Sequence, residues 1–184
     1  MNRSIAQSRI VFLALMLLAV SGANASDAER GAELLLPFKK QLKQALVEGL
    51  QEGPLNAIAV CRIEAPQIAD ALSNDDLKIG RTSHRLRNPE NVAPEWVDDV
   101  LSVYLADDSD REPQLVRLED NRYGYVEPIS TAPLCLACHG DTLADDVEAK
   151  IKELYPDDKA TGFKLDELRG VFWLEYSALL ADEG

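Results

Sequence analysis

Two cysteines and a histidine lie within five consecutive positions in the segment CLACHG, residues 135–140. The chain of 184 residues has only three cysteines and two histidines, so three of these five side chains are concentrated here. The spacing Cys135-x-x-Cys138-His139 is typical of c-type haem attachment, because two thiols can add to the porphyrin vinyl groups while the adjoining imidazole lies close to the iron. We therefore expect one covalently attached haem c, with His139 as an axial ligand.

Other uses of the same side chains stay open. Cys135 and Cys138 could form a thioredoxin-like redox pair, but that site opens a helix in a βαβ unit, and no such pattern surrounds this motif. They could form a structural disulfide, which leaves His139 without a role. Zinc could be bound by these three residues and Cys61, but zinc ribbons usually have two local ligand pairs and this chain has one.

The elements that must position the motif begin with two predicted helices. Residues 28–50 place apolar side chains at steps of three and four, which indicates an amphipathic helix ending near Gly53-Pro54. A second helix is predicted over residues 55–72, kinked or split at Pro66 because its ring clashes with the preceding turn. Cys61 shares the apolar face of this helix, where a free cysteine is more often a core residue than a ligand.

Strands and shorter helices account for most of the rest. Helices are predicted over residues 95–105 and 145–154. Apolar and alternating runs predict strands over residues 77–83, 114–119, 123–129 and 168–176, with a hairpin turn at residues 120–122. This order favours an α+β fold, an antiparallel sheet covered by helices.

A haem ring needs an apolar slot and a partner for its propionates. The aromatic and apolar candidates for the slot are Tyr123, Tyr125, Ile129, Phe163, Phe172 and Trp173. The densest basic patch of this acidic chain is formed by Arg81, Arg85 and Arg87, which we consider candidates to pair with the propionates. A solvated loop that offsets nearby acidic residues explains the same arginines equally well.

The first 25 residues have the pattern of a cleaved signal peptide. Arg3 and Arg9 precede an apolar run over residues 10–20, and Ala23-Asn24-Ala25 forms a small-x-small cleavage site. The expected mature domain, residues 26–184, is then exported and soluble, without a stable membrane span. Removing Arg3 and Arg9 from the 19 basic residues leaves 17 against 32 acidic ones, a net charge of −15. Such a charge argues against a nucleic-acid partner.

The chain also resembles a known family. The segments AVCRIEAPQIA (59–69), RTSHRLRNPENVAPEW (81–96), CLACHG and YPDDKATGFKLDELRG (155–170) are similar, in the same order, to those of the Tll0287-like haem c domains. The resemblance implies a PAS-like fold with covalent haem, often used as an extracytoplasmic sensor region. It also implies an axial cysteine in the AVCRIEAP-type helix, here Cys61, opposite His139. His84 departs from the family pattern and competes with Cys61 as the second ligand.

These observations lead to one main hypothesis and one alternative. We expect a periplasmic, single-domain c-type haem protein that senses redox state or a diatomic gas. Because no output domain follows Tyr176, signalling is expected to need a separate protein partner. The alternative is a soluble electron-transfer cytochrome of low potential. Both methionines, Met1 and Met16, lie in the signal segment, so the mature chain has no methionine for the His/Met ligation that raises the potential of a haem. No acid–base constellation accompanies the motif, so we do not expect an enzyme.

Overall fold

The computed structural model describes residues 23–107 and 111–181. Most of the predicted signal peptide, residues 1–22, lies outside the described residues. In the part of the chain that is described, no helix is both long and apolar enough to cross a membrane.

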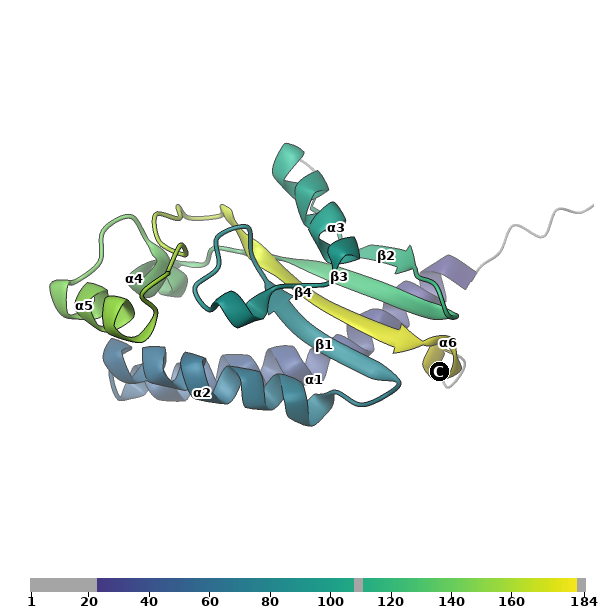
Figure 1. Cartoon of the computed structure of the whole chain (residues 1–184), viewed down its shortest axis with the longest axis horizontal. Helices are drawn as coiled ribbons and strands as arrows, with labels where there is room; N and C mark the ends of the chain where they lie inside the picture. The colour runs from purple at the N-terminus through teal and green to yellow at the C-terminus, as the bar shows by residue number, and fades with distance from the viewer. Residues whose placement is uncertain (1–22, 108–110, 182–184) are drawn as a thin grey trace, which may run out of the picture.

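Two long helices form one layer of the molecule. Helix α1 (Ala23–Gln51) and helix α2 (Pro54–Leu72) lie side by side beneath the sheet (Figure 1). They are joined through Gly53, whose φ of 108° favours glycine, and Pro54 then occupies the first turn of α2, where its missing N–H is not needed. Helix α2 runs without interruption through Pro66, so the predicted split at this residue does not occur.

The second layer is a four-stranded sheet, described over strands β1 (Leu77–Thr82), β2 (Gln114–Arg117), β3 (Arg122–Ser130) and β4 (Leu168–Ser177). The strand order is β1-β4-β3-β2, and every pair is antiparallel. Asp120 and Asn121 adopt positive φ values of 54° and 57° in the predicted hairpin turn, a conformation that Asp and Asn tolerate better than most residues.

The sheet buries both of its faces. Leu174, Tyr176 and Tyr125 pack toward α1 and α2 in a core completed by Leu35 and Phe38. The opposite face is covered by α3 (Glu95–Ala106), which packs Val97, Leu101 and Tyr104 against β3 and β4. The structure therefore confirms the predicted α+β class and its helix-covered antiparallel sheet.

The segment between β3 and β4 extends beyond the end of the sheet (Figure 1). It contains a 3₁₀ turn, η2 (Pro133–Cys135), the short helix α4 (Leu136–His139) and helix α5 (Asp145–Leu154). Helix α5 packs Val147 and Ile151 against Ile58 of α2, and Tyr155 completes this small cluster. The remaining described elements are the 3₁₀ turn η1 (Pro89–Asn91) and the C-terminal turn α6 (Ala178–Ala181).

Candidate cofactor-attachment site

The two motif cysteines lie on a single helical turn that is anchored to the sheet. Thr131, which is fully buried, exchanges backbone hydrogen bonds with Asp166 and Glu167 just before β4 begins. Cys135 ends η2 and Cys138 lies three residues later in α4, a spacing that places two side chains on the same side of a helix. Both thiols are partly exposed and free, so they can react with a bound molecule.

His139 is oriented by its own backbone surroundings. Its Nδ1 lies 2.6 Å from the carbonyl oxygen of Ala160, so Nδ1–H donates and the lone pair belongs to Nε2. Phe163 N donates to His139 O at 2.9 Å, and Gly162 N donates to Gly140 O at the same distance. A Cβ at Gly140 would lie 2.6 Å from the Leu136 carbonyl, so glycine lets the chain turn away here. These backbone contacts thus fix Nδ1 of the imidazole and leave Nε2 to the side chains around it.

The protonation state of His139 also suits a metal ligand. Burial lowers the pKa of this histidine well below its ordinary value, and the positive charges of Arg169 and Arg87 lower it further. A hydrogen bond to the backbone of Ala160 acts in the opposite direction but does not cancel these effects. His139 is therefore neutral at physiological pH, which is the form that binds metals.

Arg87 connects the motif to the loop that follows α5. Its Nη2 donates to the carbonyl oxygen of Cys138 at 2.6 Å and to that of Ala160 at 3.3 Å. Its Nε forms an ion pair with Asp158 at 3.0 Å, and both side chains are largely buried. One guanidinium therefore holds the end of α4 and the carbonyl that orients His139, so Arg87 is already occupied by protein groups.

Arg169 and Arg81 lie near the same histidine without a carboxylate of their own. Arg169 Nη2 lies 3.3 Å from Nε2 of His139 and is the group that faces this nitrogen. Burial, with the charges of Arg81 and Arg87, lowers the pKa of Arg169 to about 10. Among the described residues, neither Arg81 nor Arg169 forms an ion pair.

The geometry of β4 explains why Arg169 points toward the motif. The register of the β3–β4 pair shifts between Ile129 and Ser130, opposite the start of β4. Gly170 adopts a φ of 154°, and any side chain there would clash with the carbonyl of Thr82 in β1. Leu168 pairs with Ser130 and Gly170 pairs with Ile129, so Arg169 is the residue of β4 that has no Cα partner in β3.

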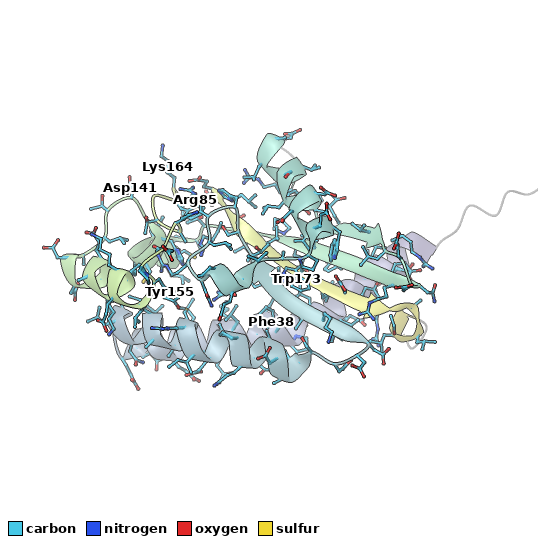
Figure 2. All side chains as sticks on the ribbon, viewed as in Figure 1. Phe38, Arg85, Asp141, Tyr155, Lys164 and Trp173 are labelled. Carbon is cyan, nitrogen blue, oxygen red and sulfur yellow. The ribbon has the colours of Figure 1, made fainter. Side chains whose placement is uncertain are left out.

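Cys61 lies across from the motif on helix α2, which contacts both α4 and α5. Burial raises the pKa of Cys138, the charge of Arg87 lowers it, and the nearby thiols of Cys61 and Cys135 raise it further. The pKa of Tyr155 is likewise raised mainly by burial and then by Cys61. Cys138 also packs against the apolar cluster that contains Tyr155, so Cys61, Cys138 and Tyr155 lie in one neighbourhood (Tyr155 is labelled in Figure 2).

His84 and Arg85 belong to a neighbouring group centred on Phe163. His84 is exposed and meets the Phe163 ring edge-on, with 5.7 Å between ring centroids. Arg85 stacks on the same ring at 3.6 Å and forms an ion pair with Glu167 at 2.5 Å. Cavities of about 380 and 190 Å³ border His84, and neither is lined by a motif cysteine. Arg85 therefore already has protein partners on the Phe163 side of the site.

The predicted apolar slot is only partly gathered at the site. Phe163 is buried, and its ring centroid lies 6.3 Å from that of His139. Phe172 instead packs on Phe38 of α1, and Tyr123 stacks on Tyr176. Figure 2 shows Trp173 and Phe38 at the sheet, away from Tyr155. The remaining candidates, Tyr125 and Ile129, lie in β3.

Sequence reasoning missed Tyr155 and Arg169 as site residues. Both lie in the segment YPDDKATGFKLDELRG, which carries the family resemblance. That segment was the one available signal, because neither residue has a spacing to the cysteines that indicates a role.

The structure bears on the alternatives for the motif. All three cysteines are free, and the antiparallel sheet contains no βαβ unit around them. Within residues 23–107 and 111–181, no group of three or more His, Cys, Asp or Glu side chains is placed to hold a metal ion by itself.

Comparisons with known proteins identify a family and a similar fold. The family model described as Tll0287-like matches residues 14–177. A solved structure, "Crystal structure of the cyanobacterial heme-protein Tll0287", is similar with a TM-score of 0.56 and 21% sequence identity. The match covers 76% of this chain and 90% of that one, and it supports the shared fold. No curated protein matches the chain.

Proposed function

Because this chain belongs to the Tll0287-like family, we propose that it is an exported protein with one covalent haem c that senses redox state or a diatomic gas. The observation that carries the proposal is the arrangement of His139. Its Nδ1–H donates to Ala160 O at 2.6 Å, which leaves Nε2 as the ligand atom beside two thiols on the same helical turn. The similar cyanobacterial protein is a haem protein, which supports the same cofactor here.

The residues of the site fit the chemistry of haem. Cys135 and Cys138 are free thiols at the spacing needed for two thioether bonds, and Gly140 closes the turn behind them. The unpaired guanidiniums nearby suit acidic propionates. When bound, haem supplies a redox-active iron that can also bind a diatomic gas. The protein's part is to fix the ligands, set the local charge and limit access of water.

Cys61 is the proposed second axial ligand. It lies on α2 near Cys138, whereas His84 is exposed and packs on Phe163. A thiol that coordinates a metal is deprotonated, and a thiolate favours the ferric state because its negative charge offsets the additional positive charge of the iron. If Cys61 held the iron, its bond would therefore weaken on reduction. Its release would free a coordination position and alter the packing of α2, which gives a sensor a switch.

The alternative function is electron transfer at low potential. It shares the haem, the ligands and the site of export, but it requires Cys61 to remain bound in both redox states. We do not propose an enzymatic activity. We propose a signalling protein as the partner of the sensor and a redox protein as the partner of the electron carrier.

The test compares the ferric and ferrous forms of the purified, haem-loaded protein. For the sensor, we expect a six-coordinate low-spin ferric spectrum, a ferrous form that loses the sulfur ligand, and rapid binding of carbon monoxide. A ferrous form that stays six-coordinate and binds carbon monoxide slowly contradicts the sensor and supports the electron carrier. The His139→Ala variant is a useful comparison, because it should lose the nitrogen ligand in both states.

A further inference from the structure

Positive charge exceeds negative charge around His139. Arg169 Nη2 lies 3.3 Å from Nε2 of His139, Arg87 donates to the carbonyl of the adjacent Cys138, and Arg81 is close enough for its charge to act on the same imidazole. Asp158 is the carboxylate that pairs with one of them, Arg87. The excess of two positive charges is notable in a chain whose net charge is −13. A site with this imbalance suits a ligand that carries two negative charges.

Arg169 is poorly compensated by the protein itself. Its guanidinium has five N–H donors, and its hydrogen-bond partner is Nε2 of the neutral His139, 3.3 Å away. It also lies over the Phe163 ring, 5.0 Å from the centroid. Removing a charged group from water without an opposite charge is costly, so these two neutral contacts leave Arg169 short of an anionic partner.

Of the other arginines near the site, Arg85 and Arg87 already have acidic partners in the protein, and Arg81 does not. Arg87 bonds two carbonyls and Asp158, and Arg85 is held by Glu167 and by the carbonyl of Thr161. Arg81, at the end of β1, has no hydrogen bond or ion pair among the described contacts. Arg81 and Arg169 are therefore the two guanidiniums near His139 that have N–H groups left to donate to a carboxylate of a ligand.

We propose that Arg169 and Arg81 bind the two haem propionates, and that Arg169 leaves Nε2 of His139 to do so. The inference rests on the proposed function, since it concerns the same cofactor. It replaces Arg85 and Arg87 of the sequence prediction with Arg169. Without haem, Arg169 satisfies the lone pair of Nε2. Iron held by that nitrogen would leave the guanidinium free to bind a propionate. Arg169 would thus bind His139 in the haem-free protein and a propionate in the haem-loaded protein.

The experiment uses the haem-loaded full chain and the variants Arg169→Met, Arg81→Met and Arg122→Met. Arg122 is a matched control, because it lies near Glu175 in β4 and contacts the backbone of Asp76. Resonance Raman spectroscopy reports the propionate bending mode, whose frequency depends on hydrogen bonding to the carboxylates. We expect this mode to shift in the Arg169 and Arg81 variants and to keep its position in the Arg122 variant. The midpoint potential should also fall in the first two, because loss of a nearby positive charge favours ferric iron.

A further variant, Arg169→Lys, keeps the charge but loses the planar fork, and it should shift the Raman mode less than Arg169→Met does. The proposal is overturned if Arg169→Met leaves the propionate mode unchanged, or if Arg85→Met shifts it instead. Wild-type protein that carries no haem after maturation overturns the proposed function itself. Retained haem with an unchanged mode overturns only the role of Arg169.

Discussion

The sheet core and the α4 end of the molecule are stabilised in different ways. Between the sheet and α1, side chains such as Leu174, Tyr176 and Phe38 are almost fully buried and pack as a continuous apolar cluster. Around α4, the contacts are polar and specific: Arg87 holds two carbonyls and Asp158, and Ala160 orients His139. Packing of apolar side chains alone thus stabilises the core, whereas at the α4 end Arg81 and Arg169 have no ion-pair partner among the described residues.

This difference separates what maintains the fold from what serves the ligand. Apolar burial is non-directional, and it can support the sheet whether or not a cofactor is bound. Arginine and histidine contacts are directional, and at the α4 end they position groups rather than fill space. Variants in the two regions should therefore have separable effects, and the following predictions test that separation.

The largest effect is expected at Cys61. In Cys61→Ser, the ferric protein should change completely from low spin to high spin, because the sulfur ligand from α2 is lost while His139 remains. His84→Ala is the matched control and should keep the low-spin spectrum, since His84 is exposed and packs on Phe163. The opposite result, an unchanged Cys61→Ser and a high-spin His84→Ala, would make Cys61 an ordinary residue of the α2 packing.

A substitution in the core is expected to cause a large loss of stability while the haem site stays intact. Leu174 is fully buried, and Leu174→Ala should lower the free energy of unfolding by about 4 kcal/mol through lost burial and the cavity left behind. Leu179, which is 72% exposed, provides a control in which alanine should change little. Denaturant unfolding gives both values. Folded Leu174→Ala that has lost its low-spin ferric spectrum would show that the two regions are coupled.

A somewhat smaller loss is expected at Arg87. Arg87→Met leaves Asp158 without its ion-pair partner and removes hydrogen bonds to Cys138 O and Ala160 O, so unfolding should cost about 3 kcal/mol less. Unlike the core variant, it should also disturb the α4 end, because the carbonyl that orients His139 loses a contact. Lys152→Met, which breaks an exposed helix pair, is the control. Equal stability of the two variants would contradict the role given to Arg87.

The smallest expected effect is the loss of stability at alkaline pH that two buried tyrosines of the core cause. Burial, above all, raises the pKa of Tyr125 and of Tyr176 above the ordinary value of 10. Above about pH 10, the unfolded chain loses these protons while the folded chain keeps them, so stability should fall by up to about 1.4 kcal/mol per pH unit for each tyrosine. Stability curves between pH 9 and 11 should be less steep in Tyr125→Phe. An identical slope would contradict this assignment.

Sequence reasoning predicted local features better than long-range ones. The strand β1, the helix α5 and the turn at Asp120-Asn121 follow from periodicity and turn residues, and the structure has them within one or two residues. A kink or a split was predicted at Pro66, and the split does not occur, because α2 is continuous from Pro54 to Leu72.

The arginines show why the site was only partly predictable. Arg85 and Arg87 are two residues apart, yet one pairs with Glu167 and the other with Asp158, and neither partner is indicated by local sequence. Arg169 reaches His139 because of a register shift between β3 and β4, and periodicity cannot reveal such a shift. The motif Cys135-x-x-Cys138-His139 was recognisable because its chemistry depends on spacing within one helical turn. The roles of these residues, and cleavage before Ser26, stay predictions.

The most direct test of the account is the intact mass of the purified, matured protein under denaturing conditions. Thioether bonds survive unfolding, so the account predicts the mass of residues 26–184 plus one haem, and the polypeptide mass alone for Cys135→Ala combined with Cys138→Ala. Digestion should locate the added mass on the peptide that contains CLACHG. Wild-type protein with the bare polypeptide mass, with haem eluting separately or with no haem at all, would contradict covalent attachment at this site.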